Sequence, residues 1–180
     1  MLHQPSILGL SAAMLLAVSS PANDAQFVLS SSGALRMTAS GHAEYGALPP
    51  TTDLPAAFSI TLGAQSEGAL VLMQRVGSIP LAGRYAVSEW TGNDSPDFSA
   101  VFVAGSPAEP VGVFRGKSGV VTITATRPGR IEGKFRIEAR GFLASAPEKE
   151  DVKVTLHGTF IATGDRTLAV LDRLELAPPL

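Results

Sequence analysis

The sequence predicts an all-β protein of about eight to ten short strands, arranged as an antiparallel β-sandwich, with a β-barrel as the alternative. Apolar and polar residues alternate with a period of two over many segments, as in strands with one buried face. Turn-forming Gly, Pro, Asn and Asp residues recur roughly every ten residues, and no segment keeps a helical periodicity. These observations argue against the alternating strand–helix order of nucleotide-binding folds.

The composition indicates one globular domain that folds without disulfides. The chain has 180 residues, of which 45% are hydrophobic and 17% charged. Its net charge of −2 provides no broad cationic field, so we expect no nucleic-acid partner. It contains no cysteine, which excludes thiolate metal sites, a cysteine nucleophile and a lipid anchor on an N-terminal cysteine.

The N-terminus resembles a secretory signal. Ile7–Val18 is an uncharged apolar run that is too short to span a bilayer, which takes about 20 residues. Small residues, Ser20 and Ala22, then stand where a signal peptidase requires them. We therefore expect a signal peptide over residues 1–22, a single antiparallel β domain over 23–180, and a periplasmic or extracellular location. The segment before the apolar run has no Lys or Arg, which leaves open a start codon further upstream.

The N-terminal half alternates less regularly than the rest but with the same period. The strands expected there are Leu35–Gly41, Phe58–Leu62, Ala69–Met73, Arg84–Ser88 and Phe98–Val103. Turn signals separate them at Leu48–Pro50, Gly77–Pro80, Gly92–Pro96 and Gly105–Pro107.

The C-terminal half predicts a four-stranded antiparallel meander. Its expected strands are Val120–Ala125, Ile131–Ala139, Val152–Phe160 and Thr167–Leu176. The first two form a hairpin, because Arg127–Arg130 contains the Pro-Gly pair of a tight turn. The charged segment Ser145–Asp151 is expected to be a solvated loop. The charged face between Arg130 and Arg140 is expected to keep the sheet soluble and to discourage edge pairing, with a protein-binding role as the alternative.

A Gly-x-Phe triplet occurs three times, at Gly112–Phe114, Gly133–Phe135 and Gly158–Phe160. Glycine and phenylalanine share a strand face in each triplet. We expect the glycine to leave room for an aromatic ring on a neighbouring strand, which helps to fix the register. A ligand-lining role for these rings is the alternative.

Part of the chain resembles bacterial exported β-sandwich domains of unknown function, some secreted and many of them lipoproteins. The resemblance covers about residues 81–162 and lies in Ser118–Thr124, Arg130–Phe135 and His157–Phe160, preceded by the Gly-x-Tyr strand of Leu81–Val87. It implies a β-sandwich at a bacterial envelope. No catalytic residue is carried over by it.

Candidate binding residues gather in one Gly- and Pro-marked loop. Trp90 is the best single contact candidate, with packing under the loop as its alternative. Asn93, Asp94 and Asp97 supply oxygen ligands of the kind that calcium prefers. Such side chains more often bond to turn backbone, so we expect no metal and no cofactor.

Other chemical motifs are weak. His42 and Glu44 lie two apart on one strand face and would form a two-His-one-carboxylate metal site with His157 only if their strands were neighbours. Gly116–Ser118 resembles the end of a phosphate-binding loop, but Val111 replaces the first glycine and no helix is expected after it. No Gly-x-Ser-x-Gly elbow occurs, so serine hydrolase activity is not expected.

Two functions remain in view. The first is a non-enzymatic envelope or surface interaction module, with a filled core and an unknown envelope or extracellular protein as partner. The second is a lipocalin-like carrier of a small apolar ligand, with an open mouth. Its cavity would be lined by Phe58, Phe102, Phe114, Phe135 and Phe160. A carboxylate-based hydrolase stays open, and two carboxylates about 5–10 Å apart in a cleft would favour it. The processed chain is not expected to be an integral membrane protein.

Overall fold

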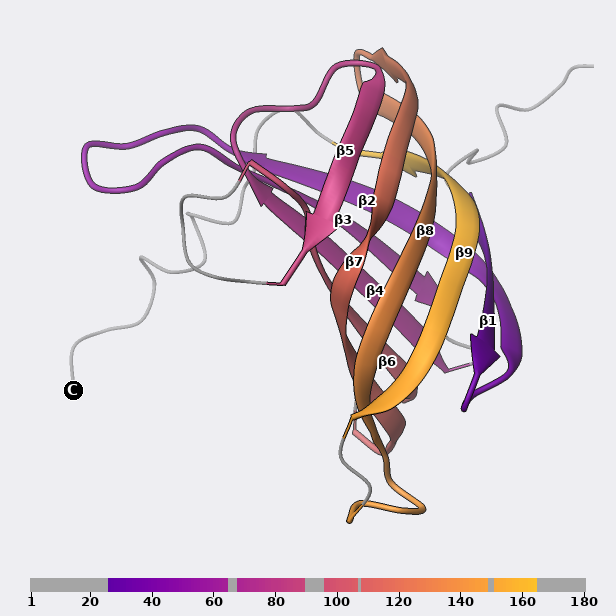
Figure 1. Ribbon diagram of the computed structural model, residues 1–180. Coiled ribbons are helices and arrows are strands. Elements are labelled where there is room, and N and C mark those ends of the chain that lie inside the picture. The colour runs from indigo at the N-terminus through magenta and orange to yellow at the C-terminus, as the bar shows by residue number, and fades with distance from the viewer. Residues whose placement is uncertain (1–25, 65–67, 90–95, 107, 149–150, 165–180) are drawn as a thin grey trace, which may run out of the picture.

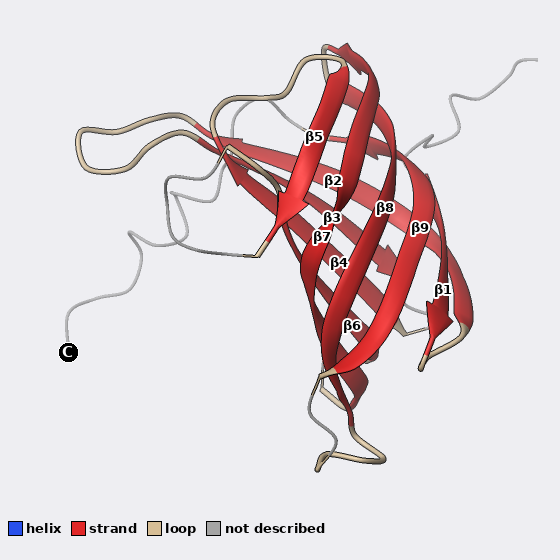
Figure 2. Ribbon diagram, viewed as in Figure 1, coloured by secondary structure: helices blue, strands red, loops and turns tan. Residues whose placement is uncertain are grey.

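The chain folds into β-strands joined by turns and loops (Figures 1 and 2). The computed structural model describes residues 26–64, 68–89, 96–106, 108–148 and 151–164, and these contain strands but no helix. The strands are β1 (Gln26–Gly33), β2 (Met37–Leu48), β3 (Ala57–Ala64), β4 (Ala69–Val76), β5 (Gly83–Ser88), β6 (Ser99–Gly105), β7 (Pro110–Arg127), β8 (Arg130–Leu143) and β9 (Val152–Thr163).

Eight of the strands close into an antiparallel barrel, and the sandwich prediction is therefore wrong. The hydrogen-bonded order is β7-β6-β4-β3-β2-β1-β9-β8, and β8 pairs again with β7. A sandwich needs two sheets that are not joined at both sides. Here β1 joins β2 to β9, and β6 joins β4 to β7, so one continuous sheet encloses the core. The barrel alternative is confirmed.

The barrel is flattened, with β7, β8 and β9 in front of β2, β3, β4 and β6 (Figure 1). The long strand β7 makes this shape possible because it changes partner along its length. Its first half pairs with β6 and its second half with β5, and the register shifts between Gly116 and Ser118 where the partner changes. A bulge of this kind bends a strand and increases its twist. The ninth strand, β5, therefore lies beside β7 but outside the closed circuit.

The side chains that point into the barrel are apolar. They alternate with outward residues along every strand of the circuit, as the period-two pattern predicts. The described residues contain one buried polar side chain, Ser31, whose hydroxyl donates to the Leu35 carbonyl and accepts from the Met37 N–H. The interior is therefore a hydrophobic core in which the buried polar group is satisfied.

Most predicted strands are present, and one strand was missed. β1 was not predicted, although Phe27 and Leu29 alternate inward along it. β7, β8 and β9 form three strands of the expected meander. The proposed fourth strand, Thr167–Leu176, lies outside the described residues. β9 pairs with β8 on one side and with β1 on the other.

The glycine–phenylalanine prediction is confirmed for two of the triplets. Gly133 pairs with Phe160, and Phe135 pairs with Gly158, across β8 and β9. Each ring therefore covers the glycine on the opposite strand. The two triplets interlock, and this fixes the register of the hairpin.

Candidate functional site

One end of the barrel carries the features of a binding site, and we call it the upper end. The β2–β3, β4–β5 and β7–β8 connections lie there, together with the end of β9 at Gly164. The β7–β8 turn is at the top of Figure 1. Gly129 in this turn has a φ of 74°, the left-handed conformation that glycine accepts without strain.

A row of aromatic side chains lies inside the upper end. Tyr45 of β2 contacts Phe58 of β3 with 6.0 Å between ring centroids. Phe58 meets Phe98 edge-on at 6.3 Å, and Phe98 meets Tyr85 of β5 edge-on at 5.9 Å. Edge-to-face contacts at such distances are favourable. The row crosses the barrel from its back layer to β5.

Beyond the start of β6, β5 takes the place of β6 beside β7. Within the described residues β4 pairs with β3 and β6, and β5 pairs with β7. Phe98, just before β6, bonds to β5 through its backbone, to Ala86 and Ser88 at 2.9 Å each. Side chains therefore complete this part of the wall, which we call the seam.

Arg75, near the end of β4, spans the seam. Its guanidinium carbon lies 5.0 Å from the centroid of the Tyr85 ring and 5.9 Å from that of Phe98. Its Nε donates to the Pro96 carbonyl at 3.1 Å, and its Nη1 donates to the Ser78 carbonyl at 3.2 Å. The planar guanidinium thus stacks on the aromatic row and ties two connections to it.

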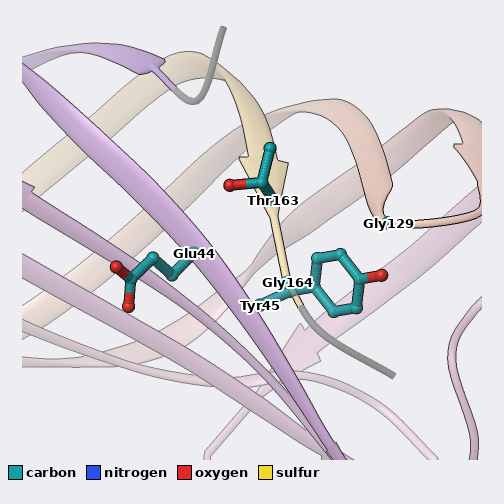
Figure 3. Close-up of a pocket in the computed structure, with 5 residues that line it drawn as sticks. All are labelled: Glu44, Tyr45, Gly129, Thr163 and Gly164. Carbon is teal, nitrogen blue, oxygen red and sulfur yellow. The ribbon is translucent and has the colours of Figure 1, made fainter. Parts of the chain in front are cut away.

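A pocket of about 430 Å³ opens at the other end of the aromatic row. It is lined by Glu44, Tyr45, Gly129, Thr163 and Gly164 (Figure 3). Glu44 and Tyr45 project to opposite sides of β2, whereas Thr163 and Gly164 lie at the end of β9. Glu44 is paired with Thr163 in the sheet, so the two residues form the outer lip and Tyr45 forms the inner wall.

The lining of this pocket is more polar than apolar, and the Tyr45 ring is its one large apolar group. The described residues make no hydrogen bond to the Tyr45 hydroxyl, and no buried side-chain oxygen or nitrogen there lacks a partner. The hydroxyl therefore reaches the open pocket. The Glu44 carboxylate lies 3.3 Å from the His42 imidazole, and both side chains are largely exposed. A small number of polar groups fixes the orientation of a ligand in a binding pocket.

A second pocket, of about 350 Å³, lies on the outer wall over β1, β9 and β8. Glu132 and Lys134 contribute charges to its lining, beside apolar Val28 and Ile161. Each of the two pockets has one carboxylate among the described residues that line it, Glu44 or Glu132. The pair of carboxylates that glycoside hydrolysis needs is not assembled in either.

The structure places only part of the predicted binding loop. Trp90, Asn93 and Asp94 lie outside the described residues. Asp97 is half-buried beside Phe98, and the Pro96 carbonyl bonds to Arg75. The described residues on the two sides of this loop, Ser88 and Pro96, lie next to the seam.

The five phenylalanines proposed to line a cavity are all buried in the core. Phe58 belongs to the aromatic row, and Phe102 stacks on Phe114 at 5.8 Å. Tyr45, Tyr85 and Arg75 were not proposed as site residues, because their contacts join distant strands and produce no pattern in the sequence.

The hypothetical histidine site is not assembled. His42 lies on β2 opposite Gly63, whereas His157 lies on β9 opposite Ser30, with 2.7 Å between the Ser30 Oγ and the His157 Nε2. Strand β1 separates the two histidines. Among the residues that the structure describes, no group of three or more His, Cys, Asp or Glu could hold a metal ion.

Comparison with known proteins assigns this chain to no family. No protein-family model matches the sequence, and no curated protein or solved structure matches it. No helix among the described residues is long and apolar enough to cross a membrane. The fold and the upper end are therefore the basis for a functional proposal.

Proposed function

We propose that this barrel binds a small, mainly apolar ligand at its upper end and does not transform it chemically. The observation that carries the proposal is the aromatic row. It leads from the open pocket at Tyr45, through Phe58 and Phe98, to the seam at Tyr85. The interior of an eight-stranded barrel is either filled by side chains or holds one small ligand.

The polar lip gives the ligand an orientation. Glu44, the Tyr45 hydroxyl and Thr163 would contact a polar or cationic head group, while the rings contact an apolar body. The seam supports entry, because displacing side chains there breaks no pairing between β4 and β5. Ligand entry elsewhere in the circuit would require strand separation.

The interaction module is the second candidate, and the packing of the interior favours it. The rings of Phe58 and Phe98 are 1% and 0% exposed, so a ligand has to displace them before it enters the core. A module that acts through its outer wall needs no such displacement. The two candidates therefore differ in whether bound cargo is found.

Native mass spectrometry of the chain, expressed with its own N-terminus, tests the function and the export proposal together. An added mass of a few hundred daltons on the folded protein supports the carrier. A mature mass that starts at Asn23, in periplasm or medium, supports export by the signal in residues 1–22. An uncleaved cytoplasmic mass contradicts export.

A pocket-filling variant tests the site itself. Thr163→Trp places an indole in the lip of the pocket without altering an inward residue. Thr155→Trp is the control, because Thr155 is on the same outer face of β9 but does not line the pocket. We expect Thr163→Trp to weaken binding of the neutral fluorophore N-phenyl-1-naphthylamine at least about tenfold, and Thr155→Trp to leave it unchanged. Equal binding by both variants and the wild type contradicts the proposed site.

A further inference from the structure

The outer wall carries a contiguous apolar patch over β4, β6, β7 and β8. Most outward residues elsewhere on the wall are polar, but here they are aliphatic or aromatic. Val111, Phe142 and Val101 are 50%, 42% and 36% exposed. The patch consists of Leu70, Leu72, Val101, Val103, Val111, Val113 and Phe142.

The sheet register makes this patch continuous. Leu70 pairs with Val103, Val103 with Val113, and Val113 with Phe142, so four neighbouring strands contribute one unbroken row. Opposed residues in neighbouring strands stand about 4.5–5.5 Å apart. A contiguous apolar surface of this kind marks an interaction site.

Opposite charges flank the patch along β7. Glu109, just before the strand, and Arg115, within it, are both exposed, and the described residues form no ion pair with either side chain. Val111 and Val113 lie between them. The order is therefore acidic, apolar, apolar, basic, and its centre is Gly112.

We propose that the apolar patch is the interface between two copies of this chain. A two-fold axis that lies in the interface plane and crosses β7 at Gly112 reverses the direction of the strand. It places Glu109 of one copy against Arg115 of the other, and Val111 against Val113. Glu109, in the bend before β7, and Arg115 each lie three residues from Gly112 on opposite sides, so the axis that exchanges Val111 with Val113 brings each charge toward its opposite in the other copy.

The opposite charges at the two ends of the patch favour a second copy of the chain over other occupants. A lipid surface would use the apolar residues but would find an acidic group at one edge of the patch. A surface that is its own complement is what an isologous dimer requires. Standard interfaces bury roughly 800 Å² per partner around an apolar centre and a polar rim, and the patch with its flanking charges has this arrangement.

This interface is separate from the proposed ligand site. Phe142 and Val111 lie toward the opposite end of the barrel, where the β6–β7 and β8–β9 connections are found. The proposal therefore stands whether or not the upper end binds a ligand.

Analytical ultracentrifugation of the mature chain tests the dimer, with circular dichroism to verify folding. We expect a dimer at about 100 µM protein, and an increase of at least about tenfold in the dissociation constant for Glu109→Arg and for Arg115→Glu, because each creates two like-charge contacts. The double variant Glu109→Arg/Arg115→Glu exchanges the charges and should return the constant to within about threefold of the wild type. Such recovery is not expected from a merely local effect.

Two controls complete the test. Arg136→Glu changes an exposed cation on β8 outside the patch and should leave the dimer unchanged. Phe142→Ser removes an apolar side chain of the patch and should weaken the dimer at least about tenfold. A wild-type chain that stays monomeric at about 100 µM, or that instead cosediments as a monomer with phosphatidylcholine vesicles, overturns the proposal. A double variant no better than the single ones also overturns it.

Discussion

Phe160 of β9 lies over Gly133 of β8, so that a Cβ atom built on Gly133 would be 2.5 Å from Cζ of the ring. The relationship is reciprocal, since a Cβ on Gly158 would be 2.8 Å from Cζ of Phe135. The contacts continue on the other side, where Phe27 of β1 pairs with both Phe160 and Gly41. Glycines on β2 and β8 thus flank two rings on β1 and β9, at the point where β1 closes the barrel.

We expect Gly133→Ala to lower the free energy of unfolding by about 1–3 kcal/mol or more, the cost of overpacking. The added methyl group would also meet the Thr122 carbonyl oxygen at 2.7 Å, and backbone cannot move aside as a side chain can. Gly63→Ala is the matched control, because no atom lies within 4 Å of a Cβ there. It should leave stability unchanged or raise it by up to about 1 kcal/mol. Urea unfolding measures both, and equal effects would contradict the aromatic–glycine explanation.

These triplets show how much of the fold a local sequence pattern can predict. Alternation along β8 and β9 predicts their faces, and the Gly-x-Phe spacing predicts that rings and glycines share the interior. The choice between barrel and sandwich depends instead on which distant strands pair. Strand β1 combines the apolar run Phe27–Leu29 with three serines and shows only a short alternation, yet it joins β2 to β9 and closes the circuit.

The site was harder to predict than the fold. Tyr45, Phe58, Tyr85 and Phe98 are far apart in the sequence and meet only because the barrel brings four segments together. Arg75 is one polar residue at the end of an apolar strand, and nothing local shows that it stacks on two rings. A sequence read segment by segment contains no signal for contacts between segments.

Arg75→Met should loosen the seam. The variant keeps a long apolar side chain but loses two hydrogen bonds from a charged donor and the contact with the Tyr85 and Phe98 rings. We expect the free energy of unfolding to fall by about 1–3 kcal/mol, and Arg75→Lys not to restore it because an ammonium lacks the planar donor geometry.

Hydrogen exchange locates the effect of this change. The amides of Phe98 and Ser88, which bond across β5 and the start of β6, should exchange faster in Arg75→Met. Arg84→Met is the control, since Arg84 is exposed on β5 and should change stability by less than about 0.5 kcal/mol. Unchanged exchange at Phe98 would show that Arg75 does not hold the seam.

Asp151 allows backbone strain to be separated from an ion pair. It has a φ of 72°, in the left-handed region, and its Oδ2 lies 2.5 Å from Nη1 of Arg140. An exposed ion pair contributes about 0–1 kcal/mol, whereas a non-glycine residue in the left-handed region costs about 1–3 kcal/mol. The strain is therefore the larger effect.

We accordingly expect Asp151→Gly to raise the free energy of unfolding by about 0.5–1 kcal/mol although it removes the ion pair. Asp151→Ala should lower it by about 1 kcal/mol, because alanine tolerates a positive φ less well than aspartate does. Arg140→Gln removes the ion pair alone and should cost less than about 1 kcal/mol. A loss of stability in Asp151→Gly equal to that in Arg140→Gln would mean that the ion pair outweighs the strain.

The two tyrosines of the aromatic row separate ligand binding from stability. The Tyr85 hydroxyl donates to the Leu81 carbonyl at 2.8 Å, whereas the Tyr45 hydroxyl is not bonded by the described residues and faces the pocket. Tyr85→Phe should therefore lower the free energy of unfolding by about 1 kcal/mol and leave ligand affinity unchanged. Tyr45→Phe should leave stability within about 0.5 kcal/mol of the wild type and weaken binding of a ligand with a polar head group roughly three- to tenfold. Urea unfolding and fluorescence titration with monodansylcadaverine, whose ammonium group provides a cationic head group, measure the two effects. If Tyr45→Phe alters stability and not binding, the polar head group does not reach this hydroxyl, and the orientation proposed for the ligand is wrong.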